Sequence, residues 1–226
     1  MTRPTLSVVL PTLNEGEGIE ATLRALQAWR SAGHEVIVVD GGSSDDTAAL
    51  ARPLANAVLS APRGRARQMN AGAAHARGDV LLFLHADTAL PPDADQLIQA
   101  ATVAGAQWGR FDVRISGRAG MLRVVAAMMN WRSRWTGIAT GDQAIFVRRD
   151  VFERVGGYPD QPLMEDIELS SRLRQVARPA CLRPPVLTSG RRWESRGVWP
   201  TIFLMWRLRW RYWRGASAQQ LAEAYR

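Results

Sequence analysis

The chemistry that this sequence could support begins with carboxylates at the ends of apolar segments. Residues 80–84 are all apolar, and the run ends in His85, Ala86 and Asp87. Such a run is typical of a strand buried on both faces, and a carboxylate at its carboxyl end lies where open α/β sheets bind ligands. There Asp87 could hold a divalent metal against a phosphate group, although it could equally cap the turn after a core strand.

Two earlier segments end in the same way. The apolar residues 6–10 lead into Pro11 and then into Asn14 and Glu15, and the strand-like segment 35–40 closes with an Asp. Apolar residues at helical spacing between such segments predict three β-then-α units, and therefore an α/β fold with a doubly wound parallel sheet. The carboxyl ends of parallel strands share one edge, so we expect these polar groups to converge. The first βα turn lacks G-x-G-x-x-G, which disfavours NAD or FAD binding.

The second half of the sequence is less regular. The expected elements are a helix over 92–104, an edge strand over 107–115, a helix over 120–135 and a buried strand over 142–147. Glu165 and Asp166 begin a further helix, where acidic residues are also favoured by the helix dipole alone. No low-complexity linker is present, so we expect one domain over 1–190 and a C-terminal extension over 191–226.

The composition excludes several kinds of site. All 29 basic residues are Arg, which removes Schiff-base and P-loop lysines and favours bidentate phosphate recognition. The single Cys181 excludes a disulfide framework or a cysteine metal cluster. The first apolar segment is too short for a signal peptide, and no run reaches 18 apolar residues. We therefore expect a cytoplasmic protein, peripheral at the inner face of the membrane if it meets one.

Several sequence blocks, taken in order, resemble family 2 glycosyltransferases, which have the GT-A fold. Together they extend over roughly residues 5 to 175, and it is their order that makes the resemblance specific. The blocks are Pro11-Thr-Leu-Asn-Glu15, Val38-Val-Asp-Gly-Gly-Ser-Ser-Asp-Asp-Thr47, Gly64-Arg-Ala-Arg-Gln-Met-Asn-Ala-Gly72, Phe83-Leu-His-Ala-Asp87, Gly141-Asp-Gln-Ala-Ile-Phe-Val147 and Met164-Glu-Asp166.

The resemblance implies a GT-A, Rossmann-like, mostly parallel sheet flanked by helices, with a C-terminal helical extension. It also implies an inverting transfer of a sugar from a nucleotide-diphosphate donor, with UDP favoured, to an acceptor hydroxyl. Asp40 would hydrogen-bond the nucleotide base, unless it only caps its own turn. Pro11, Asn14 and Glu15 would shape the wall of the nucleotide pocket.

The resemblance also assigns the metal and the general base. The family's D-x-D motif reads His85-Ala-Asp87 here, so Asp87 would bind Mg²⁺ or Mn²⁺ while His85 replaces the first Asp. A His can itself ligate Mn²⁺, but this departure leaves the choice of ion open. Asp166 would be the general base that deprotonates the acceptor hydroxyl, with Glu165 as its neighbour.

Other polar residues in the matching blocks have less certain roles. Arg65 and Arg67 could contact the diphosphate of the donor, or could simply be solvated at the start of a helix. Gly141 and Asp142 are expected on the acceptor side of the site, although Asp142 could equally be a strand-end residue.

The C-terminal extension is basic and rich in Trp. Residues 198–214 mix Trp, Phe and Leu with four Arg residues, a pattern typical of a helix in a membrane interface. The alternative is a helix packed on the core with its Arg side chains reaching into solvent. A membrane contact would suit a lipid-linked acceptor. Arg192, in an Arg-Trp pair, could meet the donor diphosphate as a lid closes.

Two other functional classes were weighed. Arg and Trp together could bind a nucleic acid by stacking and phosphate contacts, but the net positive charge lies largely in one segment and no nucleic-acid-binding motif accompanies it, so no nucleic acid is expected. Nucleotidyl transfer on the same fold would call for a Gly-rich, Lys-containing first loop, whereas this chain has Pro11 to Glu15 and no Lys.

Overall fold

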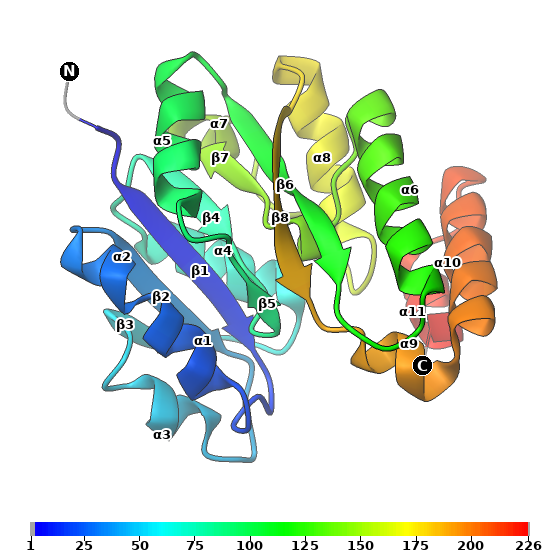
Figure 1. Cartoon of the computed structure of the whole chain (residues 1–226), viewed down its shortest axis with the longest axis horizontal. Helices are drawn as coiled ribbons and strands as arrows, with labels where there is room; N and C mark the ends of the chain where they lie inside the picture. Colours follow the sequence, from blue (N-terminus) through cyan, green and yellow to red (C-terminus); the bar gives the residue numbers. More distant parts are fainter. Residues whose placement is uncertain (1–2, 226) are drawn as a thin grey trace.

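The computed structural model describes residues 3–225, apart from the side chain of Arg192. One sheet runs through the molecule in the order β3-β2-β1-β4-β7-β6-β8-β5 (Figure 1). Its strands are β1 (Leu6–Thr12), β2 (Glu35–Asp40), β3 (Ala57–Ser60), β4 (Val80–Phe83), β5 (Thr88–Ala89), β6 (Trp108–Ile115), β7 (Phe146–Arg148) and β8 (Ala180–Thr188).

The first four strands in this order pair in parallel, as the βα units predict. β7 is antiparallel to both β4 and β6, and β5 is antiparallel to β8. The sheet is therefore mixed, with its parallel half at the N-terminal side. The carboxyl ends of β1, β2 and β4 share one edge, where the candidate site lies.

Helices cover both faces of the sheet. The helices are α1 (Ile19–Ala25), α2 (Gln27–Ser31), α3 (Thr47–Ala51), α4 (Arg65–His75), α5 (Ala94–Val103), α6 (Met121–Thr136), α7 (Arg149–Arg154), α8 (Glu165–Val176), α9 (Arg191–Arg196), α10 (Val198–Trp213) and α11 (Ala218–Tyr225). Alternate residues of β1 show the two layers: Val8 packs with α1 and α5, whereas Val9 packs with α4, α7 and α8. β1 is consequently buried on both faces.

The C-terminal extension packs on the domain through a small third core. Leu208 of α10 and Leu221 of α11 are buried together with Met164, the residue that precedes α8. In Figure 1, α10 and α11 lie beyond α6 at the edge of the molecule far from β3. Through Met164, the extension is tied directly to the segment that carries Glu165 and Asp166.

Two expectations for the second half of the chain require correction, and one strand was not expected. The segment 107–115 is a strand but not an edge strand, because β6 lies between β7 and β8. The segment 142–147 is mostly not a strand, since residues Gly141–Gln143 form a 3-10 turn and β7 begins at Phe146. β8 was not expected at all, because Pro184 and Pro185 interrupt it, and its pairing with β6 shifts register there.

Candidate active site

The loops after β1 and β2 are tied together by hydrogen bonds. The Asp40 carboxylate is buried and accepts the backbone N–H groups of Gly42 and Ser43, each at 3.0 Å, as well as the Ser43 hydroxyl. The Ser43 hydroxyl also accepts the backbone N–H of Asn14 at 2.9 Å, and the Asn14 side chain accepts the backbone N–H of Ser44 at 2.8 Å. Asp40 thus holds its own turn, and Asn14 fixes that turn against the loop that continues from Pro11.

Gln68, which the sequence did not single out, anchors α4 to the same edge. Its buried amide nitrogen donates to the carbonyl oxygens of Thr12 and Val39, both at 2.8 Å. Gly41 is required beside it, because a Cβ there would lie 3.0 Å from the Gln68 amide. This bond fixes the start of α4, and with it Arg65, above the ends of β1 and β2.

Glu15 and Asp87 bring two carboxylates close together on the same edge. Asp87 is exposed, and the Glu15 carboxylate lies 3.6 Å from the Arg191 guanidinium. Burial raises the pKa of Glu15, Arg191 opposes the rise, and the negative charge of Asp87 adds to it. Arg65 also opposes this rise, so two arginines face the pair of carboxylates.

His85 lies against the 3-10 turn at Gly141–Gln143. Its Nδ1 is 3.5 Å from a carboxylate oxygen of Asp142. A Cβ on Gly141 would lie 2.6 Å from the Cε1 and Nε2 atoms of the ring, so only glycine fits there. Nε2 is buried and has no hydrogen-bond partner among residues 3–225. A buried ring nitrogen without a hydrogen-bond partner is unusual in a folded protein.

The side chains of this edge can be compared with the ligands that a divalent cation prefers. No three His, Cys, Asp or Glu side chains of the described chain form a ready-made cluster. Mg²⁺ and Mn²⁺ are commonly held by one or two carboxylates plus substrate phosphate oxygens, so an exposed Asp87 fits such an ion together with a bound diphosphate. The role of His85 as a second ligand stays a prediction, because its Nδ1 lies beside Asp142 and its Nε2 is buried against Gly141.

Asp166 and Glu165 stand at the N-terminus of α8. The two oxygens of Asp166 accept the backbone N–H groups of Gly141 at 2.8 Å and Ile167 at 2.7 Å. Burial raises the pKa of Asp166, and these two N–H groups oppose the rise by favouring the carboxylate. Burial and the neighbouring Asp166 raise the pKa of Glu165, while Arg65 opposes the rise at both residues.

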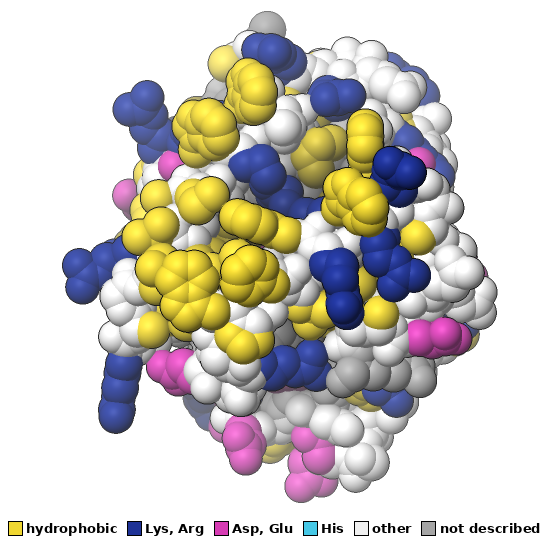
Figure 2. Space-filling model, turned by 90° about the vertical axis from the view of Figure 1, so that its right-hand side faces the viewer, with side chains coloured by type: hydrophobic (Ala, Val, Ile, Leu, Met, Phe, Trp, Pro, Cys, Tyr) yellow, Lys and Arg dark blue, Asp and Glu magenta, His cyan; other side chains and the backbone are white. Residues whose placement is uncertain are grey.

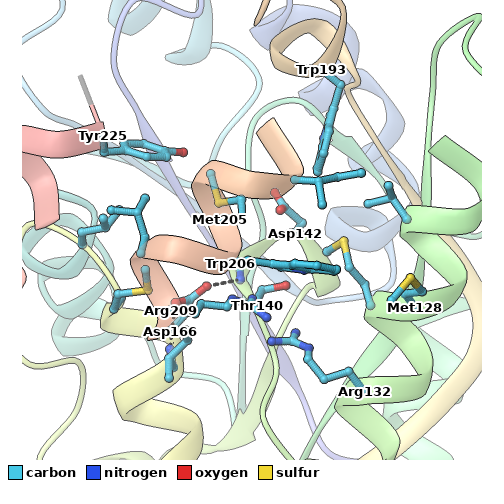
Figure 3. A pocket seen from close by; sticks show the side chains of 18 of the residues that line it. Met128, Arg132, Thr140, Asp142, Asp166, Trp193, Met205, Trp206, Arg209 and Tyr225 are labelled. Atoms are coloured by element: carbon cyan, nitrogen blue, oxygen red, sulfur yellow. Dashed lines mark hydrogen bonds between the residues drawn. The ribbon is translucent and has the colours of Figure 1, made fainter. Parts of the chain in front are cut away.

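A cavity of about 580 Å³ opens above these carboxylates, between α6 and α10 (Figure 3). Polar side chains lie at its inner end, where Arg132 and Asp166 point towards one another beneath the ring of Trp206. The remaining wall is overwhelmingly apolar. It is formed by Met121, Val124, Val125, Met128, Met129, Trp131, Leu163, Met164, Ile167, Trp193, Trp199, Ile202, Met205, Trp206, Leu208 and Tyr225.

Residues 7–156, more than half of the chain, match the family described as Glycosyl transferase family 2. The chain belongs to this family. The match covers every strand from β1 to β7 and the helices between them, and it ends before Glu165 and the C-terminal extension. The functions of these later segments therefore rest on the geometry described above.

Relatives agree with the family 2 assignment. The probable glycosyltransferase YdaM of Bacillus subtilis is 28% identical over an alignment of 237 residues that covers 94% of this chain and 55% of that protein. An uncharacterized glycosyltransferase of Mycobacterium tuberculosis is 33% identical over an alignment of 190 residues that covers 80% of this chain and 72% of that protein. The chain thus spans little more than half the length of YdaM.

Solved structures confirm the GT-A fold. The mannosyltransferase PcManGT from Pyrobaculum calidifontis, in complex with GDP-Man and Mn²⁺, superimposes with a TM-score of 0.61 at 27% identity. That superposition covers 84% of this chain and 57% of PcManGT. TarS from S. aureus superimposes with a TM-score of 0.66 at 18% identity, covering 82% of this chain and 60% of that one. None of the described helices of this family 2 chain is long and apolar enough to cross a membrane.

The candidate residues of this family 2 chain fall into two groups, with Arg65 between them. Those around the loops after β1, β2 and β4 are Pro11, Asn14, Glu15, Asp40 and Asp87; those around α8 and the 3-10 turn are His85, Gly141, Asp142, Glu165 and Asp166. Arg67 points elsewhere and pairs with Asp160 at 2.7 Å. The side chain of Arg192 lies outside the described part of the chain.

The sequence also missed three arginines. Arg191, the neighbour of Arg192 in the Arg-Trp pair, contacts Glu15, while Arg132 and Arg209 line the cavity. Arg132 lies in the expected helix over 120–135 and belongs to no recognisable sequence motif. Only the packing of α6 against α10 reveals its position.

Proposed function

We propose that this protein transfers a sugar from a nucleotide-diphosphate donor to an acceptor hydroxyl with inversion at the anomeric carbon. The observation that carries the proposal is the placement of Asp166 at the inner end of an open cavity, with Arg65 facing both Asp166 and Glu15. A single displacement needs a base on the acceptor side and positive charge on the leaving-group side. The residues around α8 would provide the base, and Arg65 with the residues around the loops after β1, β2 and β4 would bind the leaving group.

The donor is proposed to lie over the ends of β1, β2 and β4. Within residues 3–225, the Asp40 Oδ1 atom accepts a hydrogen bond only from the Ser43 hydroxyl, so it keeps capacity for a donor on the nucleotide base. UDP is the favoured nucleotide, and GDP is the second candidate because PcManGT was solved with GDP-Man. Arg65 and Arg191 would then offset the charge of the diphosphate.

A divalent cation is proposed as the cofactor. Asp87 would hold Mg²⁺ or Mn²⁺, with His85 as a second ligand and the diphosphate oxygens completing the shell. When bound, such an ion stabilises the charge that develops on the diphosphate as it leaves.

Asp166 is proposed as the general base, with Glu165 beside it. Its raised pKa brings the carboxylate closer to neutral pH, where a base accepts a proton more readily. Gly141 donates its N–H to Asp166 and, with Asp142, borders the acceptor side of the cavity. The acceptor is proposed to enter between α6 and α10, which suits a lipid-linked molecule because this wall is apolar.

The surface around the cavity entrance supports contact with a membrane. Figure 2 shows exposed apolar side chains interleaved with Arg on the face of the molecule that carries α10. Trp213 is 81% exposed and Trp135 is 73% exposed, and the exposed Phe203, Trp206 and Trp210 lie on the same helix as Trp213. Aromatic and basic residues together favour the interface of an anionic bilayer. This surface supports the proposal that the protein is peripheral at the inner, cytoplasmic face of the membrane.

Release of UDP or GDP from sugar donors tests the proposed reaction without knowledge of the acceptor. Water replaces the acceptor, and the panel contains UDP-glucose, UDP-N-acetylglucosamine and GDP-mannose with Mn²⁺. Asp166→Asn removes the base and should slow release by roughly 10²–10⁴-fold. In the wild type, release should fall as the pH drops through the raised pKa of this carboxyl, because protonation removes the base. Asp93→Asn, an exposed carboxyl at the start of α5, is the control; equal rates for the Asp166 variant and the wild type would exclude Asp166 as base.

A further inference from the structure

Arg132 of α6 has an unusual environment for a charged side chain. Its Nε and Nη2 atoms are buried and have no hydrogen-bond partner in the described part of the chain, and no carboxylate there lies within ion-pair distance. A buried guanidinium without a partner is costly, so proteins normally pair it. Burial lowers the pKa of Arg132, the charge of Asp166 opposes the fall, and the group remains a cation at neutral pH.

A second arginine nearby shows how the fold treats a structural one. Arg110 of β6 is fully buried, but it pairs with Asp112 and donates to the backbone carbonyl of Asn130 at 3.1 Å. Arg134 shares the same Asp112. Asp112 is thus shared by two other arginines, and the positive charge of Arg110 adds to the unfavourable environment of Arg132.

The two unpaired nitrogen atoms of Arg132 are covered by protein, but the residue lines the cavity. Arg132 lines the cavity wall and reaches from α6 to a point beneath the ring of Trp206, towards Asp166 (Figure 3). Arg209 of α10 lines the same space from the other side. A planar guanidinium with two free donors matches the geometry of a phosphate or carboxylate group. The inner end of the cavity is therefore built for an anion, next to the proposed base.

The rest of the cavity requires an apolar ligand. Met128, Met205 and Trp199 are among the side chains that line it, and exposed apolar side chains continue from it onto the surface of α10. Methionine side chains adapt to chains of varied shape, and apolar walls exclude a strongly hydrated sugar acceptor. A ligand that satisfies both ends has an anionic group and an apolar tail.

We infer that the acceptor is an anionic amphiphile, whose phosphate or carboxylate group is bound by Arg132 and whose apolar tail lies between α6 and α10. That the bound amphiphile is the acceptor rests on the proposed function, whereas the existence of the anion site does not. Arg132 is then a binding residue that sets the position of the acceptor hydroxyl relative to Asp166.

Binding of dodecyl phosphate, dodecanol and inorganic phosphate to the full chain tests the inference. Dodecyl phosphate is used below its micellar concentration, and titration calorimetry is checked against the fluorescence of the cavity tryptophans. The wild type should bind dodecyl phosphate at least tenfold more tightly than dodecanol. Arg132→Gln should abolish this preference while leaving dodecanol affinity unchanged, and Arg132→Lys should restore part of it. Arg123→Gln, an exposed arginine of the same helix that does not line the cavity, should behave like the wild type.

Several results would overturn the inference. These are equal affinity of the wild type for dodecyl phosphate and dodecanol, an unchanged preference in Arg132→Gln, or inorganic phosphate binding as tightly as dodecyl phosphate. Loss of an unpaired buried charge should not destabilise the fold, so the thermal stability of Arg132→Gln should equal or exceed that of the wild type. A marked loss of stability would instead assign Arg132 a structural role.

UDP and GDP titrations with Mn²⁺ on the same variants separate this inference from the proposed function. Nucleotide binding without a preference for dodecyl phosphate would overturn the amphiphilic acceptor and leave sugar transfer standing. If no nucleotide bound but the wild type still preferred dodecyl phosphate to dodecanol, sugar transfer would be overturned. The amphiphile would then not be a sugar acceptor, and the anion site at Arg132 would remain.

Discussion

At the scale of single residues, Glu165 is a carboxyl whose charge works against the stability of the fold. It is 5% exposed, and burial is the main cause of its raised pKa, with the charge of Asp166 second. The folded protein therefore holds the Glu165 proton more tightly than the unfolded chain does. Stability is then lost as the pH rises through the interval between the ordinary pKa of a Glu, about 4.3, and the raised one.

Glu165→Gln should consequently stabilise the protein above that interval and have little effect below it. Each kcal/mol gained raises Tm by about 2–4 °C for a chain of this size. Thermal unfolding of the variant and the wild type at pH 8 and pH 4 measures the difference. A variant that is less stable than the wild type at pH 8 would mean that the Glu165 charge is compensated by Arg65 and His85, whose charges oppose the rise of its pKa.

The sequence indicated some of these residues and could not indicate others. Asp40, Asp87 and Asp166 were found because each follows or begins a segment with a recognisable pattern. The orphaned state of Arg132 and the contact of Arg191 with Glu15 depend on elements distant in the chain, and no local pattern reports them. Which of the predicted roles each carboxylate performs also depends on bound substrate.

At the scale of elements, α4 positions the cationic side of the site. It packs so closely on β1 and β2 that a Cβ on Gly72 would lie 2.4 Å from Val9 and 3.0 Å from Val39. Gly72→Ala should therefore lower the free energy of unfolding by roughly 1–3 kcal/mol, as overpacking of a core does. It should also slow donor hydrolysis, because α4 carries Arg65.

Urea unfolding measures the effect of Gly72→Ala. Gly18→Ala is the matched control, since Gly18 has no atom within 4 Å of the new Cβ and a φ of −118° that any residue can adopt. If both variants were equally stable, α4 would be free to move away from the sheet, and the fixed position of Arg65 would not hold.

Strands covered on both faces were predicted well, and those with broken patterns were not. β2 and β4 were predicted because nearly every residue in them is buried, so residues 36–39 and 80–83 are all apolar. β8 alternates less regularly, and its central residues 183–185 are exposed, so its sequence resembles a loop. The 3-10 turn at Gly141–Gln143 replaced part of an expected strand because Gly141 must lie against His85 and donate to Asp166.

At the scale of the whole molecule, the cavity entrance and the aromatic surface lie on the same side. Trp210 and Trp213 of α10 are exposed and do not line the cavity, so replacing them should spare the binding of donor and acceptor. The double variant Trp210→Ser, Trp213→Ser should bind vesicles of anionic phosphatidylglycerol roughly tenfold more weakly than the wild type, because two interfacial anchors are lost.

Vesicle sedimentation measures this binding. Val103→Ser on α5 and Val176→Ser on α8 are controls, since both valines are exposed outside α10. The wild type should bind more weakly to neutral phosphatidylcholine vesicles, and added salt should weaken its binding to anionic vesicles, because the Arg residues of α10 contribute to the attraction. If the wild type did not bind anionic vesicles, the proposed membrane contact would be wrong, and the proposed sugar transfer would be unaffected.

Calorimetric titration of UDP and then GDP, with and without Mn²⁺ or Mg²⁺, tests the central claim most directly. We expect the wild type to bind one of the two nucleotides only when the metal is present. Asp87→Ala should lose this binding, and Asp93→Ala should retain it. That result would identify the donor class and the metal ligand together. Absence of binding of either nucleotide under any of these conditions would contradict the proposal that this family 2 chain transfers sugars from a nucleotide donor.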